Sequence, residues 1–203
     1  MSNAKDRIDA CISRFREKNV DDRDIARRLF LHDLPFVFAD HPDEGFELFN
    51  KISVRWNVPF SSVRATGSAQ LGYSYYKGKD FIAGKSDLDI SLINPSLFQQ
   101  FSEFCYVLTN RYSDRTKFGG AGGLKPNEQA NAFLEYLAKG YFRPDYMPTC
   151  PKKTGWDEFF GRLATEYYPI FKFQTITAGI YLTEGFFEQK QASLVAEFEK
   201  RKL

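Results

Sequence analysis

Residues 66–92 constrain the fold of this chain more than any other stretch, because two aspartates stand there in an apolar frame. In the sequence KSDLDISL, Asp87 and Asp89 alternate with the aliphatic residues Leu88, Ile90 and Leu92. Side chains alternate between the two faces of a β-strand, so a strand here places both carboxylates on one face. Two neighbouring carboxylates repel each other unless a cation lies between them. The pattern therefore predicts a strand with a divalent metal site of Asp87 and Asp89.

A glycine–serine pair in the sequence ATGSAQLG precedes the two aspartates and predicts a phosphate site. Gly67 allows the backbone to come close to a ligand, and Ser68 adds a hydroxyl group. Backbone N–H groups that open a helix can bind anionic oxygens. Together with the metal site, this turn predicts a triphosphate held between the start of a helix and a cation.

The order of Gly67, Ser68, Gly72, Asp87 and Asp89 resembles the DNA polymerase beta-like nucleotidyltransferase superfamily. A looser similarity links the chain to bacterial minimal nucleotidyltransferase-like proteins, through a GSARLG-type start, an RPD segment and a later helix led by tryptophan. The resemblance implies that the serine and its turn hold the nucleotide phosphates. It also implies that the two aspartates bind Mg²⁺ or Mn²⁺ and are catalytic.

As a function, the resemblance implies transfer of a nucleoside monophosphate from an NTP or dNTP to an acceptor hydroxyl. The acceptor would be a nucleic-acid end, a nucleotide or oligonucleotide, a small molecule or a protein. Some small bacterial members act in antiphage (antiviral defence) or toxin–antitoxin systems, and the resemblance extends that context to this chain. The alternative is a catalytically silent nucleotidyltransferase fold that binds nucleotide, RNA or a partner protein.

The segment between the two halves of this pattern is longer than usual for the superfamily. It holds three lysines among three tyrosines, and Lys85 and Ser86 directly precede the first aspartate. One interpretation is a flap over the triphosphate, with Lys85 and Ser86 binding nucleotide. The other is an exposed hairpin with solubilising lysines.

A third carboxylate on a later strand, acting as general base, is also common in the superfamily. The expected late strand, residues 170–177, contains no acid, and Gln174 stands where one is sought. Asp145, Asp157 or Glu166 could supply the acid from another element. Alternatively, Asp145 forms a structural salt bridge with Arg143 across a proline turn.

Length and composition favour one α/β (α+β) domain. The chain has 203 residues, 43% of them hydrophobic, and a net charge of +2 that argues neither for nor against nucleic acid. Its three cysteines lack metal-ligand spacing, and no apolar run is long enough for a membrane span, so a cytoplasmic protein is expected. Residues 1–58 are expected to be helical, 59–182 to form the catalytic core and 183–203 to form a helix.

Hydrophobic periodicity predicts a small mixed sheet with helices mainly on one side and helical extensions at both ends. The arginines on the polar side of the second predicted helix are predicted to form a solvated face or to contact phosphate. A glycine-rich segment, 118–126, is predicted to be a mobile connection. The helices are predicted at residues 4–19, 22–32, 43–56, 96–111, 126–139, 156–167 and 184–202.

Overall fold

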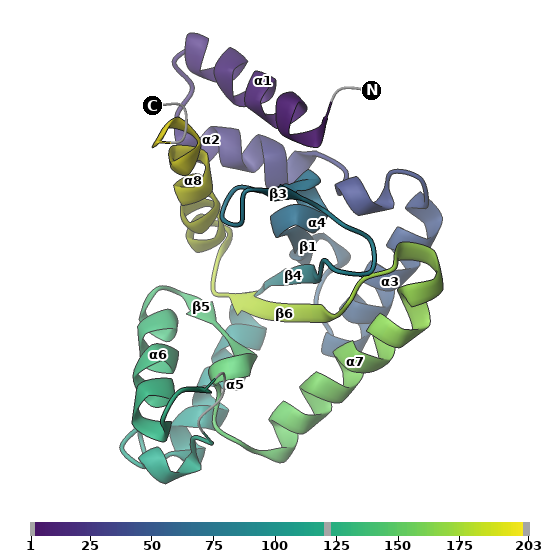
Figure 1. Ribbon diagram of the computed structural model, residues 1–203. Coiled ribbons are helices and arrows are strands. Elements are labelled where there is room, and N and C mark those ends of the chain that lie inside the picture. Colours follow the sequence, from purple (N-terminus) through teal and green to yellow (C-terminus); the bar gives the residue numbers. More distant parts are fainter. Residues whose placement is uncertain (1–2, 120–122, 201–203) are drawn as a thin grey trace.

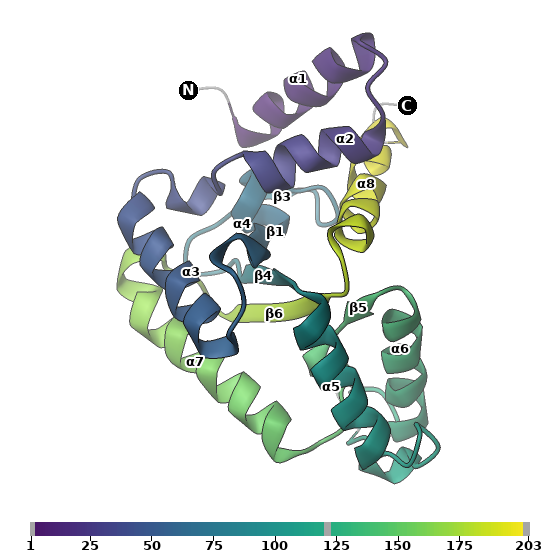
Figure 2. The ribbon, with the colours of Figure 1, turned by 180° about the vertical axis from the view of Figure 1, so that it is seen from behind.

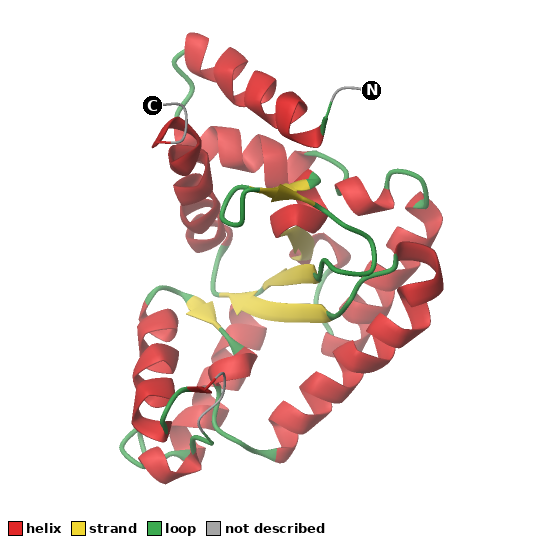
Figure 3. Ribbon diagram, viewed as in Figure 1, coloured by secondary structure: helices red, strands yellow, loops and turns green. Residues whose placement is uncertain are grey.

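The computed structural model describes residues 3–119 and 123–200, and its centre is a four-stranded mixed sheet (Figure 1; Figure 3). The strand order is β1 (Val63–Thr66), β4 (Leu88–Ile93), β6 (Ile176–Tyr181) and β5 (Tyr141–Phe142). β4 and β6 run parallel, and the outer strands β1 and β5 are antiparallel to their neighbours. The predicted mixed sheet is therefore confirmed.

One face of the sheet is apolar and packs into the larger of two hydrophobic clusters. Alternate positions of the strands supply buried aliphatic side chains, among them Ala65, Leu88, Ile90 and Ile180. Three helices cover this face: α3 (Pro42–Trp56), α5 (Pro95–Leu108) and α7 (Pro151–Phe171). In Figure 2, α5 and α7 are seen below β4 and β6, and α3 is seen to the left of these strands.

A second group of helices packs on the other side, so the prediction of helices mainly on one side is only partly right. It consists of α1 (Ala4–Glu17), α2 (Asp22–Arg27), the short α4 (Gly67–Leu71) and α8 (Glu184–Lys200). A π-helical turn, Arg28–His32, continues α2. These helices lie above the sheet in Figure 1. They share a smaller apolar cluster to which β6 contributes Tyr181.

The remaining elements extend the sheet and close its ends. α6 (Pro126–Ala138) leads into β5, and a 3₁₀ turn (Pro144–Tyr146) then carries the chain towards α7. The lysine-rich segment forms a two-stranded hairpin of β2 (Tyr73–Ser74) and β3 (Lys79–Asp80). Other 3₁₀ turns in the described residues lie at Phe36–Phe38, Phe60–Ser62 and Arg115–Lys117. The predicted glycine-rich connection falls partly outside the described residues.

Prolines and left-handed residues set several helix boundaries. Proline at the first helical position has no N–H to leave unpaired and a backbone angle already suited to the helix. Asn57 ends α3 and Lys172 ends α7, each with a positive φ, at 51° and 53°. The helices that begin with proline are α3, α5, α6 and α7, at Pro42, Pro95, Pro126 and Pro151.

The predicted late strand at residues 170–177 is wrong, because α7 continues to Phe171 and β6 begins at Ile176. The helix accommodates Pro169 in its last turn. The buried rings of Tyr167 and Phe171 stack there at a centroid distance of 6.1 Å and hold that turn against the core. Gln174 therefore lies in the connection before the strand.

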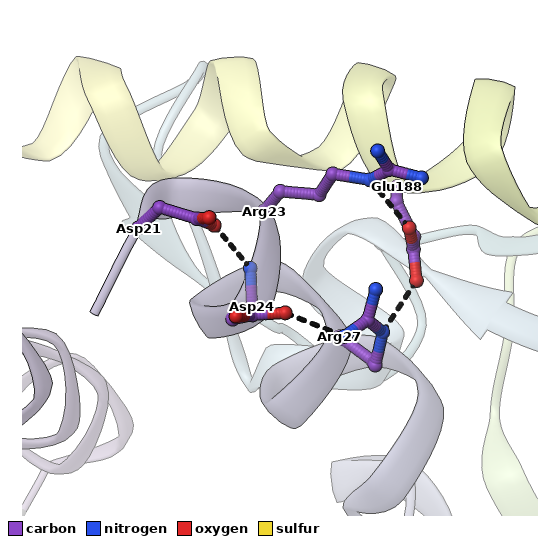
Figure 4. Close-up of polar contacts among 5 residues, drawn as sticks. All are labelled: Asp21, Arg23, Asp24, Arg27 and Glu188. Atoms are coloured by element: carbon purple, nitrogen blue, oxygen red, sulfur yellow. Dashed lines mark hydrogen bonds and ion pairs between the residues drawn. The ribbon is translucent and has the colours of Figure 1, made fainter.

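An ionic cluster joins α2 to α8 (Figure 4). The Glu188 side chain is only 2% exposed and accepts hydrogen bonds from Arg23 Nε and Arg27 Nε, both at 2.6 Å. Asp21 caps α2 by accepting from the Asp24 N–H at 2.8 Å, and Asp24 also binds Arg27. Two of the arginines predicted to face solvent or phosphate thus bind one buried carboxylate.

We expect Glu188→Gln to reduce the free energy of unfolding by about 1–2 kcal/mol at neutral pH. Hydrogen bonds from Arg27 and Arg23 hold the pKa of Glu188 below its usual value, despite its burial. This contribution is present above the unfolded-state pKa near 4.3 and is lost as pH falls through the folded-state pKa. Urea unfolding at several pH values should show the difference from wild type shrinking below about pH 4. If the difference in unfolding free energy between wild type and Glu188→Gln did not depend on pH, this prediction would be contradicted. The control is Glu158→Gln, a substitution of an exposed residue on α7.

Candidate active site

Three polar side chains lie in a row across the polar face of the sheet. The strand register pairs Thr66 of β1 with Asp89 of β4, and Asp89 with Thr177 of β6. Residues paired across neighbouring strands share a face, so all three side chains point away from the apolar core. The carboxylate of Asp89 thus lies at the centre of the row.

Each aspartate of the pair accepts a hydrogen bond from a threonine hydroxyl group. Thr177 lies in the parallel strand β6, and Thr175 directly precedes that strand. The Thr177 hydroxyl donates to Asp89 Oδ1 at 2.7 Å, and the Thr175 hydroxyl donates to Asp87 Oδ1 at 2.8 Å. These bonds fix the orientation of both carboxylates. In each carboxylate the second oxygen, Oδ2, remains available to a ligand.

Gly67 brings the backbone of the glycine–serine turn against the central carboxylate. It adopts a positive φ of 62°, and a Cβ built at this position would lie 2.8 Å from Asp89 Oδ2. Any other side chain would therefore be strained and would occupy the space beside that oxygen. The predicted convergence of this turn with Asp89 is present in the structure.

The environment of Asp89 opposes its ionisation. Asp89 is exposed to solvent within the cleft, but the protein around it partly desolvates the carboxylate and raises the pKa of Asp89 above its usual value. The hydrogen bond from Thr177 acts in the opposite direction, and the negative charge of Asp87 raises the pKa further. The positive charges of Lys77 and Arg143 act weakly to lower it. A divalent cation beside both carboxylates would relieve the repulsion between them.

A cleft of about 1040 Å³ opens on this row. Its wall near Asp89 includes Thr66, Gly67 and Thr177, and its far wall is the face of α7. Tyr141 packs over Gly179 and stacks on Tyr181 at a centroid distance of 4.3 Å. The far wall is largely apolar or aromatic, with Trp156, Phe160, Ala164 and Tyr168 at helical spacing.

The rim of the cleft carries a stacked arginine. The guanidinium of Arg143 lies over the rings of Tyr136 and Tyr146, at 4.9 and 4.7 Å from their centroids. It also donates to both carboxylate oxygens of Asp145, from Nη2 at 2.5 Å and from Nε at 3.2 Å. The salt bridge considered between Arg143 and Asp145 is thus observed, and it occupies the fork that a phosphate would need.

The predicted site residues divide into those at the cleft and those outside its lining. Gly67 and Asp89 line the cleft. Asp87 is not in the lining but accepts a hydrogen bond from Thr175, which lines the cleft. Ser68, Lys85 and Ser86 do not line it. The Ser86 hydroxyl accepts from the Ile82 N–H at 2.9 Å, and Lys85 is exposed. Nucleotide binding by these three stays a prediction.

Of the other predicted acids, Asp145 and Asp157 line the cleft, but each pairs with a basic side chain, Arg143 or Lys153. Glu166 is absent from the lining and pairs with Lys51 instead. The position beside Asp89 on the later strand belongs to Thr177. Glu166 thus lies outside the cleft, while the role of third carboxylate stays a prediction for Asp145 and Asp157.

Sequence reasoning missed the two threonines that hold the aspartates. The signal was present: Thr175, Thr177, Gly179 and Tyr181 alternate with apolar residues, a pattern typical of a half-buried strand. The expected strand began six residues too early, so Gln174 rather than Thr177 was assigned to the position of the expected acid. The wall that α7 contributes to the cleft also went unrecognised, although Trp156, Phe160 and Ala164 lie within the predicted helix 156–167.

The aspartate pair fits a magnesium-type ion better than a metal that needs an all-protein cage. Within residues 3–119 and 123–200, no group of three or more histidine, cysteine or acidic residues is placed to hold a metal. Mg²⁺, however, is commonly bound through one or two carboxylates, with water and substrate phosphates completing its shell. Asp87 and Asp89, repelling each other and oriented by hydroxyl groups, meet that requirement.

Comparison with protein-family models finds no match, and comparisons with curated proteins and with solved structures find none either. In the described residues, every helix is too short or too polar to cross a membrane.

Proposed function

We propose that the chain is a metal-dependent nucleotidyltransferase, which moves a nucleoside monophosphate from an NTP or dNTP to an acceptor. One observation carries the proposal: the glycine–serine turn lies directly against the central carboxylate of the aspartate pair, at the edge of a cleft large enough for a nucleotide. This supports the resemblance drawn from the sequence. A bacterial antiphage or toxin–antitoxin role, and a cytoplasmic location, belong to the same proposal.

In the proposed reaction, the acceptor oxygen attacks the α-phosphorus, the bond to the pyrophosphate oxygen breaks, and the acceptor proton passes to solvent or to a phosphate oxygen. A bound Mg²⁺ or Mn²⁺ would polarise the α-phosphate and neutralise charge on the leaving oxygen. Asp87 and Asp89 would hold it, while Thr175 and Thr177 keep their carboxylates in place. Gly67 leaves room for the phosphates beside Asp89.

The direct test is incubation of the purified protein with NTPs labelled at the α-phosphate and, in parallel, at the γ-phosphate. Acceptors would include an oligonucleotide, a second nucleotide and peptides bearing hydroxyl groups. Metal-dependent transfer of the α-label, without the γ-label, supports the proposal. Nucleotide binding without transfer to any acceptor would favour a silent binding module.

The alternative of a silent module is favoured by a specific observation: the residue paired with Asp89 on the later strand is Thr177 rather than an acid. Thr177→Asp separates the two possibilities. The new carboxylate adds negative charge beside Asp89, so the unfolding temperature without metal should fall. In an enzyme it should also raise the transfer rate at least about 10-fold, because a general base contributes 10²–10⁴-fold. Thr177→Asn is the neutral control. No transfer by wild type or by either variant would contradict the enzymatic role.

A further inference from the structure

The fourth strand of the sheet, β5, pairs with only two of the six residues of its neighbour β6. β5 pairs with β6 at two positions, Tyr141 with Tyr181 and Phe142 with Ile180. Pro144 then turns the chain away into a 3₁₀ helix, and proline cannot donate to a ladder. On the side of β6 away from β4, none of the described strands pairs with residues 176–178.

The direction of the backbone groups on this free edge follows from the neighbouring hydrogen bonds. The carbonyls of Thr175 and Tyr181 accept from the residues at the two ends of β4, and the Leu182 N–H donates to the Gly140 carbonyl. Odd-numbered residues therefore turn their N–H and C=O groups towards β4, and even-numbered residues turn them towards β5. Ile176 and Ala178 consequently direct theirs outward, and both residues line the cleft.

We propose that this edge of β6 binds an extended polypeptide segment as an added antiparallel strand, and that this segment is the acceptor. The acceptor role rests on the proposed function; the strand addition does not. The segment would lie along β6 beyond the point where β5 ends, as a continuation of that strand. Exposed N–H and C=O groups at a sheet edge are a template for such pairing. The cleft volume of about 1040 Å³ lies at the upper end of the range usual for small-molecule pockets, and both the nucleotide and the segment are placed in it.

The two walls of the cleft define the sequence pattern of such a segment. Residues opposite Ile176 and Ala178 would face the apolar wall of α7, with Phe160 and Ala164, and should be apolar. The residue opposite Thr177 would share the face of Asp89, two strands away at about 4.8 Å per strand. A serine, threonine or tyrosine there would present its hydroxyl towards the metal-bound phosphate. The substrate class is a protein segment of alternating apolar and hydroxyl residues.

The test uses the fluorescent peptide Lys-Val-Tyr-Val-Tyr-Val-Lys and measures its binding by anisotropy without nucleotide. Ala178→Pro removes an outward N–H at an edge position where proline is tolerated, so we expect peptide affinity to fall at least about 10-fold. Ala178→Val keeps that N–H and should bind within about twofold of wild type. Nucleotide binding should be the same in both variants.

If Ala178→Pro fails to fold, the same peptide methylated at its valine nitrogens answers the question on the wild-type protein. We expect it to bind at least about 10-fold more weakly, because those N–H groups would pair with β6. Equal binding of the two peptides, or no binding at millimolar concentration, would overturn the proposal. So would label transfer to an oligonucleotide that Ala178→Pro leaves unchanged. Peptide binding without transfer would sustain the edge site and count against the nucleotidyltransferase function instead.

Discussion

Asp89→Asn is expected to lower nucleotidyl transfer at least about 100-fold while leaving the fold intact. The substitution keeps the size of the side chain and removes the charge that would bind the cation beside Gly67. Label transfer from an α-labelled NTP, at saturating Mg²⁺, measures it. Asp80→Asn, an exposed change on β3, is the matched control and should retain full activity. Unchanged transfer by Asp89→Asn would remove the central residue of the proposed site.

The same variant should be more stable than wild type when no metal is present. Because partial desolvation in the cleft and the charge of Asp87 raise the pKa of Asp89 in the folded protein, its ionised form destabilises the fold above the unfolded-state pKa near 3.9. That destabilisation is relieved as pH falls through the folded-state pKa. The unfolding temperature of Asp89→Asn should exceed that of wild type at pH 7, and adding Mg²⁺ should narrow the gap. A lower unfolding temperature at pH 7 would show that Asp89 serves stability instead.

Phe142→Ala is expected to reduce the free energy of unfolding by about 3–5 kcal/mol. Phe142 lies in β5, is fully buried and meets three phenylalanine rings edge to face, at centroid distances of 5.3–6.4 Å. Truncation removes those contacts and leaves a cavity between α5, α6 and the sheet. Chemical denaturation measures the loss.

Phe142→Leu fills most of that space and should cost less than about 1.5 kcal/mol. Because Phe142 separates Tyr141 from Arg143, both of which line the cleft, the alanine variant should also weaken nucleotide binding. Equal stability of the two variants would show that β5 is not anchored through this ring.

The sequence allowed β4 and most helices to be predicted, because their signals are local. The alternation around Asp87 and Asp89 predicted β4 and its polar face, and proline marked the start of α3, α5 and α6 within a residue. The convergence of Gly67 with Asp89 was also predicted correctly.

What sequence could not show depends on which strands become neighbours. The hydroxyl groups that hold the aspartates come from residues 88 positions later, and only the pairing of β4 with β6 brings them together. The helix α7 continues past Pro169 because tertiary packing of the aromatic rings of Tyr167 and Phe171 stabilises its last turn. Likewise, the partners of Arg23 and Arg27 lie on α8, far along the chain.

The most direct test of the proposed site is a crystal structure grown with Mn²⁺ and a nucleotide whose α,β-bridging oxygen is replaced by methylene. Manganese scatters anomalously, so its position is independent of how the density is interpreted. We predict an anomalous peak within about 2.0–2.2 Å of oxygens from both Asp87 and Asp89, with the α-phosphate on its other side and the phosphates passing Gly67. A nucleotide bound elsewhere, or bound in this cleft with no metal at the two aspartates, would contradict the account.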